Sequence, residues 1–134
     1  MPAGPSDFGS ETSPLHLDLP IHPESVAAAR HEVQRYAEGQ GIDPERVALA
    51  VSEAMTNALV HGSGSQRRDM AVRVAAQLHG DALVVSVTDE GPGVEPHLQH
   101  DQLGLGLMLI AATADSVCIE ALPGAGTRVV MRFH

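Results

Sequence analysis

The sequence contains no lysine and no tryptophan, and only 2% of its 134 residues are aromatic. These are Phe8, Tyr36 and Phe133. Binding of single-stranded nucleic acid relies on aromatic side chains that stack on bases, so this function is not expected. The eight basic residues are all arginines, and 17 acidic residues bring the net charge to -9. No basic face is visible, which excludes nucleic acid as an expected partner.

The single cysteine, Cys118, excludes an intrachain disulfide. It lies in "SVCIEAL", where a small side chain on a strand is a better interpretation than a reactive thiol. No apolar run reaches the length of a membrane span, and the N-terminus lacks the basic-then-apolar pattern of a signal peptide. We therefore expect a cytoplasmic protein without a membrane partner.

Length and apolar content predict one domain with one core, since 43% of the residues are hydrophobic. Residues 1–13 are rich in Pro, Gly and Ser and are expected to be a disordered tail, which leaves 14–134 as the domain. Apolar spacing predicts an α+β two-layer sandwich, with a mixed, mostly antiparallel five-stranded sheet and three helices on one face. The expected strands are 14–20, 70–78, 82–89, "SVCIEAL" and "TRVVMRF", and the expected helices are 24–40, 44–61 (stopped by Gly62) and 104–115.

The segment "VSEAMTNALVHG", Val51 to Gly62, places polar residues in a mostly apolar helix. At about 100° per residue, Glu53, Asn57 and His61 form one polar stripe between two apolar faces. A carboxylate can accept a proton, an amide oxygen can ligate a hard cation, and an imidazole can titrate. The stripe is therefore either a solvent-exposed rim or part of a functional site, and spacing alone leaves both possibilities open.

Glycine motifs follow further along the chain. In "TDEGPGV", Asp89 ends an apolar strand, and Gly91 and Gly93 form either a simple turn or a place where a flat ligand approaches the backbone. In the second case Asp89 would accept a hydrogen bond from an exocyclic amine. In "QLGLGLMLI", Gly104 and Gly106 begin a helix whose free N–H groups suit a phosphate. This second segment matches neither a dinucleotide fingerprint nor a P-loop.

The four pieces E-x-x-x-N-A-x-x-H-G, D-x-G-P-G, G-L-G-L and G-x-G-T occur in this order, on the elements just described. Together they resemble the GHKL (Bergerat-fold) ATPase superfamily of gyrase, heat-shock chaperones, histidine kinases and mismatch-repair ATPases. The resemblance covers roughly residues 14–134. Within the superfamily, the short chain and "VSEAMTNALVHG" are similar to the RsbW-like anti-sigma-factor serine/threonine kinases. Those proteins bind a sigma factor and phosphorylate a serine on a small antagonist protein.

The resemblance implies binding of ATP and Mg²⁺. It makes Glu53 the catalytic base and Asn57 the Mg²⁺ ligand, and it places His61 at a common position of undefined role. It makes Asp89 the carboxylate that recognises adenine. The positions that it assigns to ATP binding are Asn57, His61, Asp89, Gly91, Gly93, Gly104, Leu105, Gly106 and Thr127.

The sequence departs from the family pattern before the G-L-G-L motif. Related kinases often have basic residues in this segment that reach the terminal phosphate. Here "VEPHLQHDQ" offers only His97 and His100 as cations. Arg67, Arg68 or Arg128 would have to compensate, so the efficiency of phosphoryl transfer stays open.

The resemblance therefore implies an anti-sigma factor with serine/threonine kinase activity, whose partners are a sigma factor and an antagonist protein. It also implies a possible homodimer. One alternative is a regulatory binding module that uses the nucleotide only as a switch. Two others are the ATPase domain of a histidine kinase, present as a fragment, and a related fold that has lost ATP binding.

Overall fold

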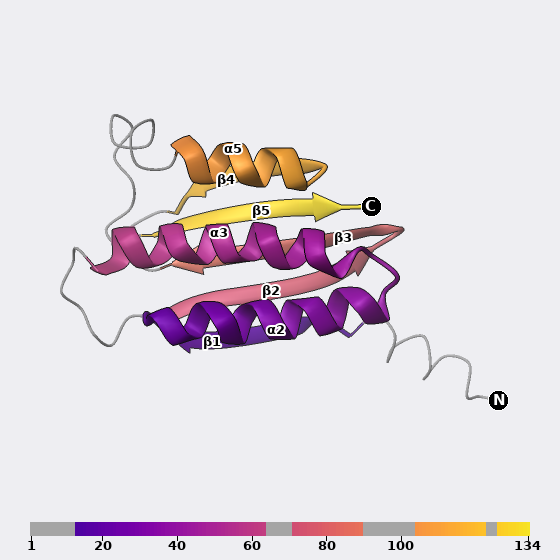
Figure 1. The fold of residues 1–134 in the computed structure, drawn as a ribbon, viewed down its shortest axis with the longest axis horizontal. Helices are drawn as coiled ribbons and strands as arrows, with labels where there is room; N and C mark the ends of the chain where they lie inside the picture. Colours follow the sequence, from indigo (N-terminus) through magenta and orange to yellow (C-terminus); the bar gives the residue numbers. More distant parts are fainter. Residues whose placement is uncertain (1–12, 64–70, 90–103, 123–125) are drawn as a thin grey trace.

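The computed structural model describes residues 13–63, 71–89, 104–122 and 126–134. The predicted tail lies almost entirely outside these residues. Five strands and three helices form one two-layer α+β domain (Figure 1). In chain order they are β1 (Leu15–Pro20), α2 (Pro23–Gly39), α3 (Pro44–Ser63), β2 (Ala71–His79), β3 (Ala82–Asp89), α5 (Gly104–Thr113), β4 (Ser116–Ala121) and β5 (Thr127–Phe133).

The strands form one sheet in the order β1-β2-β3-β5-β4, and every neighbouring pair is antiparallel. The predicted class and the number of elements are confirmed, although the sheet is more uniform than the expected mixed sheet. The reason is the position of β5. The crossover through α5 makes β3 and β4 run in the same direction, but β5 inserts between them and pairs with both. No parallel ladder therefore forms among the described strands.

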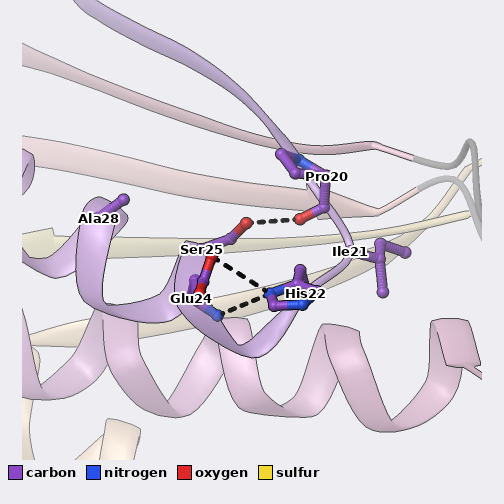
Figure 2. Close-up of a pocket in the computed structure, with 6 residues that line it drawn as sticks. All are labelled: Pro20, Ile21, His22, Glu24, Ser25 and Ala28. Atoms are coloured by element: carbon purple, nitrogen blue, oxygen red, sulfur yellow. Dashed lines mark hydrogen bonds and ion pairs between the residues drawn. The ribbon is translucent and has the colours of Figure 1, made fainter.

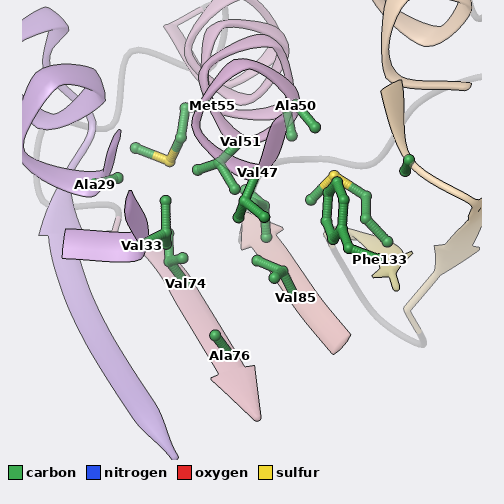
Figure 3. Packing of buried hydrophobic residues seen from close by; sticks show 14 of the residues in the cluster. Ala29, Val33, Val47, Ala50, Val51, Met55, Val74, Ala76, Val85 and Phe133 are labelled. Carbon is green, nitrogen blue, oxygen red and sulfur yellow. The ribbon is translucent and has the colours of Figure 1, made fainter. Parts of the chain in front are cut away.

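All three helices cover the same face of the sheet (Figure 1). Strand side chains alternate between the two faces, so Leu83, Val85 and Val87 of β3 point to the helices and are buried. Val51 of α3 belongs to the same core, in which Val33 of α2 lies beside Val74 of β2 and Met55 points toward α2 (Figure 3). Phe133, the last residue of β5, is also fully buried in this core. The core is therefore built almost wholly from aliphatic and methionine side chains, as the scarcity of aromatic residues requires.

Local sequence explains where the helices begin. The carboxylate of Asp43 accepts a hydrogen bond of 3.0 Å from the backbone N–H of Glu45, and Pro44 occupies the first position of α3. His22 caps α2 in the same way through its ring nitrogen, which accepts from Glu24 N–H at 3.2 Å. The predicted stop at Gly62 is wrong, because α3 continues to Ser63. A glycine inside a helix costs only about 1 kcal/mol relative to alanine, too little by itself to end a long helix.

The predicted interpretation of Cys118 agrees with its position, since it is a free, exposed side chain on the uncovered face of β4. None of the described helices is long and apolar enough to cross a membrane.

Candidate functional site

Asn57, the middle residue of the polar stripe of α3, faces the neighbouring helix α5. Glu53 and Asn57 are half-buried, while the residues on the outer side of α3, such as Leu49 and Val60, are exposed. Ser52 and Thr56 bond to their own helix, through carbonyl oxygens one turn earlier. Among the described residues, neither Glu53 nor Asn57 has a side-chain hydrogen-bond partner. Their polar atoms are therefore available to a ligand between α3 and α5.

Asn57 and Gly106 bring α3 and α5 into contact near the start of α5. A methyl group placed on Gly106 would lie 2.8 Å from Nδ2 and 3.0 Å from Oδ1 of Asn57. The absence of a side chain at Gly106 therefore lets the amide of Asn57 lie against the first turn of α5. That turn has backbone N–H groups without partners in the helix, which favour an anion. The contact joins two motifs that are far apart in the sequence.

Asp89 and Thr127 form the second part of the site. They lie opposite each other on β3 and β5 and are 8% and 6% exposed. Both share the helix-covered face with the core residues of their strands. Among the described residues, the only other buried polar side chain is Ser25, whose hydroxyl donates to the carbonyl of Pro20 at 2.7 Å. Burial of a carboxylate is costly, so Asp89, which also has an interaction partner of its own, is an unusual residue on the covered face of the sheet.

The two parts lie at the same end of the molecule. The C-terminal half of α3, the start of α5, the end of β3 and the start of β5 all meet there (Figure 1). The arrangement places a buried carboxylate on the sheet and, on the helices, an amide oxygen beside backbone N–H groups that lack partners within α5. Such a site suits a ligand with an amine-bearing ring at one end and an anionic group at the other.

Several predicted site residues cannot be placed. Gly91 and Gly93 lie outside the described residues, as do the segment before the G-L-G-L motif and Arg67 and Arg68. Gly104 and Leu105 lie in the first turn of α5, as expected. His61 lies in α3, but its side chain falls outside the description.

Arg128 can be placed, and it does not face the site. It lies on the uncovered face of the sheet, 3.5 Å from the carboxylate of Glu120 and 3.4 Å from the hydroxyl of Thr88. Register explains this orientation, because successive residues of a strand point to opposite faces and Thr127 points to the helices. In this conformation Arg128 does not supply the missing cation.

The side chains available as ligands decide whether this site can bind Mg²⁺. The described residues contain no cluster of three or more His, Cys, Asp or Glu side chains that would hold a metal ion by themselves. Mg²⁺ is commonly bound by one or two protein oxygens together with phosphate oxygens and water. An amide oxygen of Asn57 beside the anion-favouring turn of α5 fits that mode of binding.

A hollow of about 750 Å³, which the sequence does not predict, lies where β1 turns into α2 (Figure 2). Pro20, Ile21, His22, Glu24, Ser25 and Ala28 line it. Its polar groups largely bond to one another, since His22 accepts from Glu24 N–H and Ser25 donates to Pro20. The signal in the sequence was the pair of prolines around the turn, which predicts a sharp change of direction but not a hollow.

Over residues 19–133 the sequence matches a family described as the histidine kinase-like ATPase domain. The chain belongs to this family. Relatives include the anti-sigma F factor of Clostridium acetobutylicum, 29% identical over 136 residues, which cover 88% of this chain and 91% of that protein. The anti-sigma F factor of Thermoanaerobacter sp. (strain X514) is 28% identical over 136 residues, covering 90% of this chain and 92% of that one.

Solved structures agree with the family. The crystal structure of the RsbU and RsbW domains of Rv1364c from Mycobacterium tuberculosis matches with a TM-score of 0.70 and 26% identity. That match covers 90% of this chain and 32% of the other, so the present chain spans about a third of the crystallised chain. The SiaB–SiaC complex of Pseudomonas aeruginosa matches with a TM-score of 0.69 at 15% identity, covering 95% and 94%. At that identity the likeness concerns the fold alone.

Proposed function

We propose that this protein is an ATP-binding anti-sigma factor that phosphorylates a serine on an antagonist protein. The observation that carries the proposal is the contact between Asn57 and Gly106, at the same end of the molecule as the buried pair Asp89 and Thr127. Membership of the histidine kinase-like ATPase family and relatives named anti-sigma F factor support it. The same relatives support a cytoplasmic location.

Each part of the site has a role in this proposal. Asp89 accepts a hydrogen bond from the exocyclic amine of adenine, Thr127 lies beside it, and Gly91 and Gly93 shape the ring's pocket. The first turn of α5, from Gly104, binds the phosphates through backbone N–H groups.

Asn57 would hold Mg²⁺, which when bound neutralises the charge that develops during phosphoryl transfer. Glu53 lies one helical turn before Asn57, on the same stripe, and would take the proton from the attacking serine hydroxyl. His61 completes the stripe and remains without an assigned step.

The proposed partners are a sigma factor, which the relatives named anti-sigma F factor support, and an anti-sigma antagonist protein, which the resemblance of the motifs implies. A homodimer is the assembly to test first. We also propose that residues 14–134 form one ATP-binding domain preceded by a disordered tail.

The experiment uses purified protein, Mg²⁺-ATP and an antagonist protein encoded beside it. Phosphoserine on the antagonist is measured by mass spectrometry for wild type, Glu53→Gln and Glu38→Gln. Glu38 is an exposed residue near the end of α2 and serves as the matched control. Wild type and Glu38→Gln should transfer phosphate at equal rates, whereas Glu53→Gln should bind ATP but lose transfer. Equal transfer by all three proteins would exclude Glu53 as the base.

A second function, a binding module that uses the nucleotide only as a switch, is favoured by the orientation of Arg128. Arg128 is the one described residue of the three arginines named as candidates to compensate for the lack of basic residues, and it is paired with Glu120 on the other face. Nucleotide-dependent binding of a sigma factor without any phosphotransfer would support this function over the kinase.

A further inference from the structure

The end of α5 that lies away from the candidate site is held by a single arginine. Arg46, in the first turn of α3, donates from Nε and Nη2 to the backbone carbonyl of Thr113, at 3.0 and 2.9 Å. Thr113 is the last residue of α5, where carbonyl groups lack partners within the helix. One guanidinium therefore supplies donors to the C-terminus of a neighbouring helix and places a positive charge at the negative end of its dipole.

The same guanidinium is part of a closed network at the edge of the sheet. Arg46 Nη2 lies 3.4 Å from Oδ1 of Asp115, and Nη1 donates to the backbone carbonyl of His134 at 3.2 Å. His134 returns a hydrogen bond from its backbone N–H to Oδ2 of Asp115 at 2.6 Å. The arginine also lies over the ring of Phe133, 5.7 Å from its centroid. We call Arg46, Asp115 and His134 the Arg46 clamp.

Arg46 belongs to the same face of α3 as the candidate site. Residues 46, 50, 53 and 57 are spaced by three and four positions, which places them along one side of a helix. Since α3 and α5 run antiparallel, this side meets α5 at both ends. Arg46 contacts its last residue, and Asn57 contacts Gly106 near its start.

The remaining described side chains of α5 make few buried contacts that would fix the helix in place. Of its described side chains, residues 106–113, only Ile110 is buried, whereas Met108 is 69% exposed and Leu109 is 38% exposed. The helix carries no charged residue in its first or last turn that would dock it elsewhere. Its position against α3 therefore depends strongly on the two end contacts.

We propose that Arg46 is a positioning residue for the phosphate-binding end of the site: the clamp holds the far end of α5 so that its first turn stays against Asn57. This inference rests on the proposed nucleotide-binding function. It predicts that loss of Arg46 affects the two parts of the site differently, because Asp89 and Thr127 lie on β3 and β5 and not on α5. Loss of the clamp weakens binding of the phosphates and leaves recognition of adenine unchanged.

The experiment compares two ligands, Mg²⁺-ADP and adenosine, titrated into isotopically labelled protein and followed by NMR. Arg46→Ala should bind Mg²⁺-ADP at least about fivefold more weakly than wild type and adenosine equally well. Arg46→Lys keeps the charge but lacks the fork of donors, so its loss should be smaller. Arg73→Ala is the control, since Arg73 makes an exposed ion pair with Asp18 on the uncovered face and should leave both affinities unchanged.

A merely structural role of Arg46 would weaken the binding of both ligands in parallel, and that outcome would overturn the proposal. Hydrogen exchange without ligand provides a second measurement. In Arg46→Ala, amides of α5 should exchange faster while those of β2 and β3 stay protected. Unchanged exchange in α5 overturns the clamp alone, whereas failure of wild type to bind either ligand overturns the nucleotide function itself.

Discussion

Asp89 of β3 lies directly opposite Thr127 of β5, and both side chains are buried on the face that the helices cover. Side chains in such a cross-strand pair have Cβ atoms about 4.5–5.5 Å apart. The carboxylate of Asp89 and the hydroxyl of Thr127 are therefore close enough to contact the same part of a ligand. Thr127 follows Gly126, whose φ of 106° is a conformation that favours glycine. The pair thus depends on the insertion of β5 beside β3.

Replacement of Asp89 by asparagine tests its role in recognition. The change keeps the size of the side chain but removes the charge and one acceptor, which should cost about 1–3 kcal/mol in ATP binding, or roughly five- to 150-fold in affinity. Asp81→Asn, at an exposed position in the turn between β2 and β3, should bind as wild type does. Calorimetric titration with Mg²⁺-ATP measures both, and equal affinities for the two variants would contradict the role of Asp89.

Gly106→Ala should separate folding from binding. The added methyl would meet the amide of Asn57 at 2.8 Å, and this amide can rotate away because it ends a short flexible side chain. A gain in helix propensity of about 1 kcal/mol offsets the strain, so the free energy of unfolding should change little. Binding of Mg²⁺-ATP should be lost, because Asn57 is displaced.

Two further variants control for this result. Gly39→Ala, where an added methyl meets nothing within 4 Å, should preserve binding. Addition of Gly106→Ala to Asn57→Ala should cause no further loss of affinity, since the two changes act through the same side chain. Additive losses in this cycle would show that Gly106 acts independently of Asn57.

Much of the fold could be predicted because local sequence patterns determine where its helices and strands lie. Alternating residues identified the strands, and the Asp43-Pro44 pair identified the start of α3. The position of β5 between β3 and β4 could not be predicted, because pairing of distant strands depends on tertiary packing. The end of α3 was misjudged because Gly62 was weighed by its local preference alone.

The candidate site, too, could be predicted only in part. The motifs identified Asn57, Asp89 and Gly106 as candidate residues, but no spacing in the sequence shows that Asn57 contacts Gly106. Arg46 was missed altogether. Its only signal was membership of the helical face that also carries Glu53 and Asn57, and an arginine in the first turn of a helix is otherwise ordinary.

Two methionines test how the core is built. Met55 of α3 is fully buried in the core, whereas Met108 on α5 is 69% exposed. Met55→Ala should lower the free energy of unfolding by about 2–5 kcal/mol, through lost burial and the cavity that remains. Met108→Ala should change it by less than about 0.5 kcal/mol. Urea denaturation followed by circular dichroism measures both, and similar losses would show that the outer face of α5 is covered in solution.

The pH dependence of stability should depend on Asp115. The backbone N–H of His134 holds the pKa of this carboxyl below its ordinary value, with smaller contributions from the His134 ring and Arg46. A carboxylate with a lowered pKa stabilises the folded state at any pH above its unfolded pKa of about 3.9. That contribution is lost as the pH falls from there through the lower folded-state pKa, because the folded protein must then take up the proton.

Asp115→Asn should therefore be less stable than wild type at pH 7, and the difference should shrink as the pH falls below about 4. Denaturation curves of both proteins between pH 7 and pH 3 measure this difference. Nucleotide affinity measured at pH 7 adds a second comparison, since Asp115 holds Arg46 and the variant should bind Mg²⁺-ADP more weakly but adenosine equally. A stability difference that stays constant over the whole range would show that the carboxylate charge of Asp115 does not contribute to the clamp.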